Sequence, residues 1–106
     1  MKPINESITK ASEIIKALGH PVRIQILNLL SSKKNIKMSV KEIHESLGLT
    51  QSETSRHLIV MKYGSVLQYE KQGTNSYYFI NDKHSFVSCI ATCVNKFTEH
   101  NRISVK

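Results

Sequence analysis

Two helix-start signals stand close together in the middle of the chain, and they constrain its fold more than any other feature. The signals are Ser39 followed by Glu42, and Thr50 followed by Glu53. Each pair is typical of a capping box, in which a hydroxyl and a carboxylate satisfy free N–H groups at the start of a helix. Only Gly48 and Leu49 separate the end of the first helix from the start of the second. Helices joined by so short a turn cross steeply, which predicts a helix-turn-helix over residues 39–63.

Two further helices are expected before this motif. Apolar residues recur at steps of three and four between residues 5 and 18, which is typical of one helix face. Gly19 ends that helix, and a second helix is expected from Pro21 to about Leu30, because proline suits a first turn where its missing N–H does no harm. Few positions of this second helix are polar, so we expect it to be the buried centre. Residues 31–38 are expected to be a solvated loop.

After the helix-turn-helix, the pattern changes from helical to alternating. Within residues 66–80, an alternating run and a run rich in aromatic and β-branched residues flank turn residues that include Gly73, which predicts a β-hairpin, or wing. A last helix is expected over residues 82–100, with Asp82 as its N-cap. Its expected apolar stripe consists of Phe86, Ile90, Cys93, Val94 and Phe97. The fold class is therefore mostly α with a small β-hairpin, in the order ααααββα, as one domain over residues 1–106.

The charge of the chain points to an anionic partner. A chain of 106 residues with a formal net charge of +7 is typical of one basic domain, and nucleic acid is the commonest partner of such domains. The longest apolar runs are too short to cross a membrane, and the N-terminus is polar, so we expect a cytoplasmic protein without a membrane partner. Cys89 and Cys93 lie one helical turn apart, which disfavours a disulfide and agrees with a reducing compartment.

The second helix of the motif divides into two faces. Its inward residues are expected to be Thr54, Leu58 and Met61. The opposite face then carries Gln51, Ser52, Ser55 and Arg56, near the end where recognition helices contact DNA bases. A glutamine amide can pair with adenine and a guanidinium with guanine, so Gln51 and Arg56 are the expected base-reading residues. Ser52 and Ser55 are expected to hold phosphates, as is His57. The alternative is an ordinary amphipathic helix in a small bundle.

The hairpin tip and the loop before the motif carry further polar and cationic groups. Lys71, Thr74 and Asn75 suit phosphate or minor-groove contacts from a wing. A second set comprises Lys33, Lys34, Lys37 and Lys41. For each of these four lysines we favour a solvated surface position over a phosphate contact.

Together these segments resemble the ArsR-type winged helix-turn-helix transcriptional regulators over about residues 17–80. The resemblance is carried by residues 18–24, by residues 47–58 and by Gly73 with Tyr77 and Tyr78. It implies a homodimeric repressor that is built on the first and last helices, binds a roughly palindromic operator and is released by a small inducer. Independently, the apolar stripes of these two helices need a partner surface. Two positions depart from the family pattern: Ile59 replaces an outward basic residue, and Thr54 replaces an inward valine.

The metal sites that the resemblance implies are incomplete in this chain. Ser39, Val40 and Lys41 occupy the segment where many members carry a thiolate pair. Asp82 and His84 match half of a second site, but Asn95 and Thr98 stand where its remaining ligands would be, and neither replaces imidazole or carboxylate. We therefore predict no metal at either site and no cofactor.

Cys89 and Cys93 leave two interpretations open. They could join His84 or His100 in a metal or redox sensor. We favour the alternative, in which Cys93 packs as a small hydrophobic residue in a dimer seam with Cys89 at its edge.

Three functions remain to be compared. The leading hypothesis is a sequence-specific DNA-binding regulator. The alternative is a winged-helix module that docks another protein and contacts nucleic acid only weakly. An enzyme is not expected, because the sequence shows no catalytic triad, paired carboxylates, phosphate loop or complete metal constellation.

Overall fold

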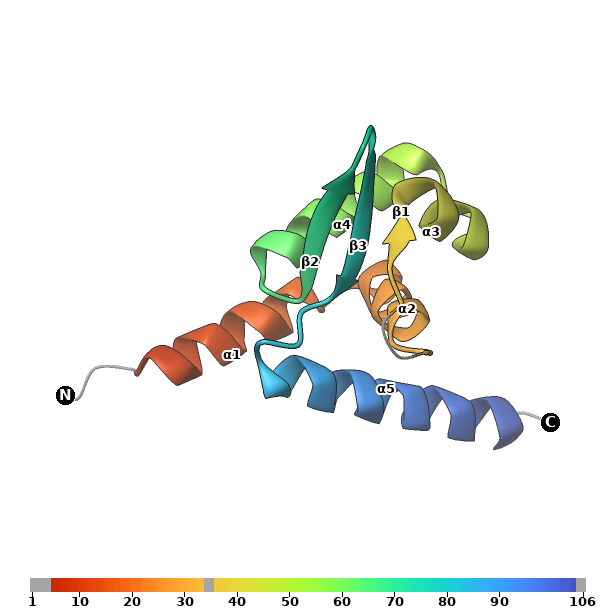
Figure 1. Cartoon of the computed structure of the whole chain (residues 1–106). Coiled ribbons are helices and arrows are strands. Elements are labelled where there is room, and N and C mark those ends of the chain that lie inside the picture. The colour runs from red at the N-terminus through yellow and green to blue at the C-terminus, as the bar shows by residue number, and fades with distance from the viewer. Residues whose placement is uncertain (1–4, 34–35, 105–106) are drawn as a thin grey trace.

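The computed structural model describes residues 5–33 and 36–104 of the chain. These residues form five helices and three strands. Figure 1 shows how they are arranged. In chain order they are α1 (Glu6–Ala17), α2 (Pro21–Leu30), β1 (Met38–Ser39), α3 (Val40–Leu47), α4 (Gln51–Tyr63), β2 (Leu67–Gln72), β3 (Asn75–Ile80) and α5 (Ser85–Ser104). The expected helices and the hairpin are confirmed.

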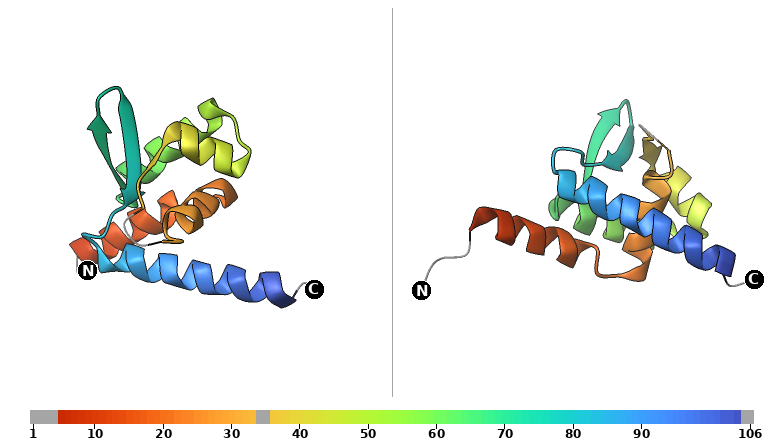
Figure 2. Two further views of the ribbon diagram at one scale, coloured as in Figure 1. Left: turned by 45° about the vertical axis from the view of Figure 1, so that its right-hand side comes forward. Right: turned by 90° about the horizontal axis from the view of Figure 1, so that it is seen from below.

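The elements divide the molecule into two sides. Helices α1 and α5 lie along one side, and α2 lies between α5 and the α3–α4 pair (Figures 1 and 2). Helix α1 also contacts α4 directly. The α3–α4 pair and the tip of the β2–β3 hairpin project from the opposite side (Figure 2). The α3–α4 pair and the tip of the wing therefore lie away from α5, whereas the base of the hairpin lies close to the start of that helix (Figure 2).

One core joins all five helices. Its buried apolar residues are Ile14, Ala17, Leu18, Ile26, Leu27, Leu30, Ile43, Leu58, Met61, Val66, Leu67, Val87 and Ala91. Helix α2 contributes three of them, which confirms it as the buried centre. Burying each large aliphatic side chain contributes roughly 1.5–3 kcal/mol, so this core is the main stabilising contribution.

A short strand between α2 and α3 is missing from the sequence prediction. Residues 31–38 were expected to be a loop, but Met38 pairs with Tyr78 and Ser39 with Tyr77, so that β1 extends the hairpin into a sheet of order β1-β3-β2. A strand of two residues has no period that a sequence pattern could reveal. The predicted order ααααββα is corrected accordingly to ααβααββα.

Of the two predicted capping boxes, the one at Ser39 is complete and the one at Thr50 is only half formed. Ser39 Oγ accepts a hydrogen bond from the Glu42 N–H, and Glu42 Oε1 accepts one from the Ser39 N–H. At α4 the Thr50 hydroxyl accepts from the Glu53 N–H, but the Glu53 carboxylate returns no bond, so the second capping box is incomplete. Gly48 has φ +69°, the left-handed conformation that glycine adopts easily at the end of a helix.

The last helix differs from its prediction at both ends. It begins at Ser85 rather than Asp82 and continues to Ser104 rather than His100, so Asp82 is not its N-cap. Residues 81–84 instead form a turn held by Asn81, whose Oδ1 accepts from the Lys83 N–H at 3.1 Å. The residues of α5 that enter the core are Val87 and Ala91. The predicted stripe lies beside them, with Phe86 37% and Phe97 69% exposed.

Helix α4 ends in a Schellman motif. The Val66 N–H donates to the Met61 carbonyl at 2.9 Å, and the Ser65 N–H donates to the Lys62 carbonyl at 3.2 Å. Glycine is usual at the position that Ser65 occupies, because φ is positive there. Ser65 has φ 68° and is the only non-glycine residue with a positive φ in the described part of the chain. A serine in this conformation costs on the order of 1 kcal/mol relative to glycine.

Gly64 permits the close contact between α1 and the end of α4. A Cβ atom at this position would lie 2.3 Å from the Cβ of Ala17, which is closer than two carbon atoms can pack. We expect Gly64→Ala to destabilise the protein by about 1–3 kcal/mol, because α1 would have to move. Urea unfolding measures this free energy.

Gly19→Ala is the matched control for Gly64→Ala. A Cβ there meets its nearest atom, the Lys16 carbonyl oxygen, at 3.4 Å. We expect its free energy of unfolding to change by less than about 1 kcal/mol. Equal losses in both variants would contradict the proposed contact.

Candidate nucleic-acid interface

Helix α4 is held by one face and exposes the other. Thr54, Leu58 and Met61 are completely buried, as the helical period predicts. The Thr54 hydroxyl has no hydrogen-bond partner in the described residues, so the side chain is held by packing alone. On the opposite face, the side chains of Gln51, Ser52 and Arg56 are exposed and that of Ser55 is half-buried. These four predicted DNA-contacting side chains are thus gathered on the first two turns of α4.

The first turn of α4 also presents backbone donors. Thr50 Oγ1 occupies the Glu53 N–H, while the N–H groups of the first two helical residues have no partner within the helix. These donors and the positive end of the helix dipole favour an anion such as a phosphate near Gln51 and Ser52.

His57 faces the body of the protein more than the other predicted DNA-contacting residues do. It is half-buried against α2, with its ring centroid 4.5 Å from that of His20. Nη1 of Arg23 lies 3.2 Å from Nδ1 of His57, and because a guanidinium can only donate, His57 accepts this bond as a neutral ring. In this position the His57 ring contacts Arg23 and His20 beneath α4. A phosphate contact by His57 stays a prediction.

Arg23 and His20 complete this contact, and sequence reasoning assigned neither of them to it. Arg23 Nε donates to the Ala17 carbonyl at 2.7 Å, which ties the end of α1 to α2. His20 is the N-cap of α2, where Nδ1 accepts from the Val22 N–H at 3.1 Å. The separation of 34 positions between Arg23 and His57 leaves no periodic signal in the sequence.

The environment of His57 lowers its pKa below the usual value of 6.5. Burial is the largest cause, and the neighbouring His20 and Arg23 lower the pKa further. Arg56 acts in the same direction, while Glu53 opposes it. The neutral ring is therefore favoured in the folded protein.

The wing carries its predicted polar residues at an exposed tip. Strands β2 and β3 pair from Leu67 with Ile80 to Gln72 with Asn75, which leaves Gly73 and Thr74 as the turn. Gly73 has φ +64°. Lys71, Thr74 and Asn75 are all exposed, so they are available to a ligand.

Two lysines near the wing are held by other side chains. Lys37 Nζ lies 2.7 Å from Glu70 Oε1 of β2 and 4.9 Å from the centre of the Phe79 ring, so it is more than a solvated loop residue. Lys62 Nζ lies 3.9 Å from the centre of the Tyr69 ring. Lys33 and Lys41 are exposed, as expected, and Lys34 lies outside the described residues.

The candidate sensor residues lie apart from the predicted DNA-contacting residues, on and just before α5. Cys89, Cys93 and His100 are exposed, and His84 is half-buried. Within residues 5–33 and 36–100, no group of three or more His, Cys, Asp or Glu side chains is placed to hold a metal ion. None of the described helices is both long and apolar enough to cross a membrane.

The fold and this surface define a class of protein. A steep helix pair with an exposed polar helix start, followed by a hairpin that projects on the same side, is a winged helix-turn-helix of the DNA-binding kind (Figure 2).

The comparisons agree on one family. A family model described as "Bacterial regulatory protein, arsR family" matches residues 20–62. An HTH-type transcriptional regulator of Methanocaldococcus jannaschii is 39% identical over 79 residues, which are 74% of this chain and 86% of that protein. The transcriptional repressor PagR of Bacillus anthracis is 38% identical over 76 residues, 72% of this chain and 74% of its own.

Solved structures give the same result. The crystal structure of PagR matches with a TM-score of 0.74 and 36% identity, over 84% of this chain and 97% of that chain. The homodimeric winged helix-turn-helix domain of Mb0332 from Mycobacterium bovis has a TM-score of 0.72 over 93% of this chain and 91% of its own, and at 23% identity it shows the fold alone. The chain belongs to the arsR family and is a DNA-binding transcriptional regulator. This supports DNA binding over the alternative of a protein-docking module.

The lowered pKa of His57 makes stability depend on pH. The unfolded chain binds the proton at a pKa near 6.5 and the folded chain only at lower pH, so stability is full above about 6.5 and falls as pH decreases below it. We expect His57→Gln, which keeps an acceptor for Arg23 but does not titrate, to lose less stability than the wild type between about pH 7.5 and about pH 5.5. Urea unfolding midpoints at the two pH values measure the difference.

His100→Gln is the control for this measurement. His100 is exposed on α5, on the side of the molecule opposite the recognition motif, so the variant should keep the pH dependence of the wild type. A His57→Gln variant with an unchanged pH dependence would contradict the role of its environment.

Proposed function

We propose that the protein is a homodimeric repressor that binds a roughly two-fold symmetric operator through α4 and the wing. The observation that carries this proposal is the exposed polar start of α4, which projects on the same side of the molecule as the wing tip. A helix can enter the major groove only when it is held by one face and free on the other, and α4 meets this condition.

Each polar residue of this surface has a proposed role. Arg56 and Gln51 read base edges, because a guanidinium pairs with guanine and an amide with adenine. Ser52 and Ser55 hold phosphates at the start of the helix, and His57 is a further candidate for a phosphate contact. From the wing tip, Lys71, Thr74 and Asn75 contact phosphates or the minor groove. The neutral residues of α4 thus supply selectivity, and the lysines supply attraction.

A second copy of the chain completes the proposed DNA-binding unit. Ile8 and Ile15 of α1 are each 57% exposed, and Phe86 of α5 is 37% exposed. Isolated apolar residues are ordinary at a surface, but these lie on the two helices that the family resemblance implies for dimerisation. The fold neighbour from Mycobacterium bovis is homodimeric, which supports a dimer without identifying its interface. Two-fold symmetry would then set the spacing of the operator half-sites.

The proposal also covers the effect on transcription, the cellular location and the signal that releases the protein from DNA. PagR, which this chain resembles at 38% identity, is a transcriptional repressor. We propose that this chain represses its target genes in the cytoplasm, that it catalyses no reaction, and that a small inducer releases it from DNA.

Residues at the two positions where the family resemblance implies metal sites have structural roles instead. Ser39 caps α3, Asn95 Nδ2 donates to Ser31 Oγ at 2.9 Å, and the Thr98 hydroxyl donates to the Val94 carbonyl at 2.9 Å. We therefore propose that the inducer acts at another site, with Cys89 and Cys93 as candidates if it is a soft metal ion or an oxidant.

Operator binding tests the proposed function. The operator is first isolated by selecting bound sequences from random DNA duplexes, and its affinity is compared with that of random duplex at moderate salt. We expect the operator to bind at least about a thousandfold more tightly. Equal affinities would show that specific recognition is wrong.

Two alanine variants separate base reading from attraction to phosphate. Arg56→Ala should weaken operator binding by about 1–3 kcal/mol while leaving random-duplex binding much less changed. Lys71→Ala should weaken both by similar factors and reduce the slope of log affinity against log salt by about 1. Fluorescence anisotropy titrations at several salt concentrations measure both effects. If Arg56→Ala weakened both duplexes equally, its assignment to base reading would fail.

A further inference from the structure

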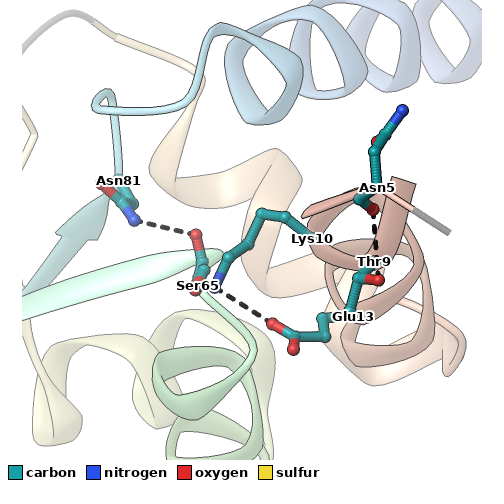
Figure 3. A network of polar contacts seen from close by, with 6 residues as sticks. All are labelled: Asn5, Thr9, Lys10, Glu13, Ser65 and Asn81. Carbon is teal, nitrogen blue, oxygen red and sulfur yellow. Dashed lines mark hydrogen bonds and ion pairs between the residues drawn. The ribbon is translucent and has the colours of Figure 1, made fainter. Parts of the chain in front are cut away.

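The turn that follows α4 is the point where the two sides of the molecule meet. It comprises Gly64, Ser65 and Val66, and we call it the α4–β2 turn. Helix α1 packs directly against it, because Gly64 leaves room for Ala17. Figure 3 shows Ser65 between Lys10 of α1 and Asn81, which follows β3. The recognition helix α4, the wing, α1 and the start of α5 therefore approach one another at this turn.

Ser65 is tied to both of these neighbours. Lys10 Nζ donates to Ser65 Oγ at 3.2 Å and lies 3.1 Å from Glu13 Oε2 (Figure 3). Asn81 Nδ2 donates to the Ser65 carbonyl at 2.9 Å (Figure 3). These bonds hold a serine in the left-handed conformation that glycine would adopt more easily, so the surroundings determine the shape of this turn.

Asn81 connects the same turn to the wing and to the start of α5. It is one of two buried polar residues in the described part of the chain and is 7% exposed. Its Oδ1 accepts from Gln68 Nε2 of β2 at 2.7 Å and from the Lys83 N–H at 3.1 Å. Its own N–H donates to the Val66 carbonyl at 2.9 Å. Through these bonds Asn81 joins the α4–β2 turn, strand β2 and the turn that precedes α5.

We propose that Ser65, Lys10 and Asn81 are positioning residues for operator recognition, which set the orientation of α4 and the wing relative to the dimerising helices. This inference rests on the proposed homodimer. In such a dimer α1 and α5 set the position of the partner subunit. The α4–β2 turn sets the orientation of each recognition helix relative to α1 and α5. The distance between two recognition helices must match one helical turn of DNA or a multiple of it. A looser turn would therefore relax the requirement for half-site spacing.

The test measures half-site spacing as well as affinity. The duplexes are the selected operator and the same operator with one base pair inserted at its centre. Wild-type protein should prefer the unmodified operator strongly. Lys10→Met and Ser65→Ala each remove the bond between α1 and the turn, and Ser65→Ala keeps a non-glycine residue at the positive φ. We expect each to reduce this preference by at least about threefold. Because both variants remove the same bond, the double variant should show little further reduction.

Lys16→Met is the matched control. Lys16 is an exposed lysine of the same helix, so the variant loses the same charge but keeps the bonds to Ser65. It should preserve the spacing preference, even if the affinity falls through lost attraction to DNA. Thermal unfolding of each variant checks that the protein is folded at the assay temperature, and a loss of stability alone would not change the ratio between the two duplexes.

The outcomes distinguish a failure of the positioning role from a failure of the proposed function. A reduced spacing preference in Lys10→Met and Ser65→Ala but not in Lys16→Met supports the positioning role. An unchanged preference in these two variants, or an equal reduction in all three, overturns it while leaving the proposed function intact. If wild-type protein failed to prefer any selected operator over random duplex, the proposed function itself would be overturned, and this inference with it.

Discussion

Burial of one face of α4 is the constraint on which the exposed side of the helix-turn-helix depends. Leu58 and Met61 are completely buried, and they anchor the helix to a core that α1, α2, α3 and α5 also enter. Because a helix repeats every 3.6 residues, fixing this inward face leaves Gln51, Ser52 and Arg56 outside. The same core holds Val66 and Leu67 at the start of the wing, so the recognition helix and the wing share one support.

The excess positive charge is distributed less simply than a count of lysines suggests. Lys37 is paired with Glu70, Lys62 lies over the Tyr69 ring, and Lys10 is held by Glu13 and Ser65. The contacts of Lys37 with Glu70, of Lys62 with Tyr69 and of Lys10 with Ser65 link separate elements, whereas Lys71 at the wing tip remains exposed. Part of the basic character of the chain thus contributes to its structure, and part is available to DNA. Arg23 adds to the first group through its contacts with Ala17 and His57.

Much of the fold could be predicted from the sequence, because its signals are local. The helix periods, Pro21, Gly48, Gly73 and the Ser39 capping box lie within one element or one turn. The bounds of α5 were predicted less well, because Asp82 resembles an N-cap while the tertiary bonds of Asn81 hold the chain in a turn up to Ser85. For the candidate site, the inward and outward faces of α4 followed from periodicity, whereas the contact of His57 with α2 did not.

The sequence by itself determined the class of this protein: a small basic domain with two closely spaced helix starts, a wing, and polar side chains on one face of the second helix. Only the tertiary structure decided how these parts are held in relation to one another. Strand β1, the Arg23–His57 contact and the bonds of Ser65 with Lys10 and Asn81 join residues that are far apart in the chain. Such contacts depend on how elements pack, and neither a period nor a local motif encodes them.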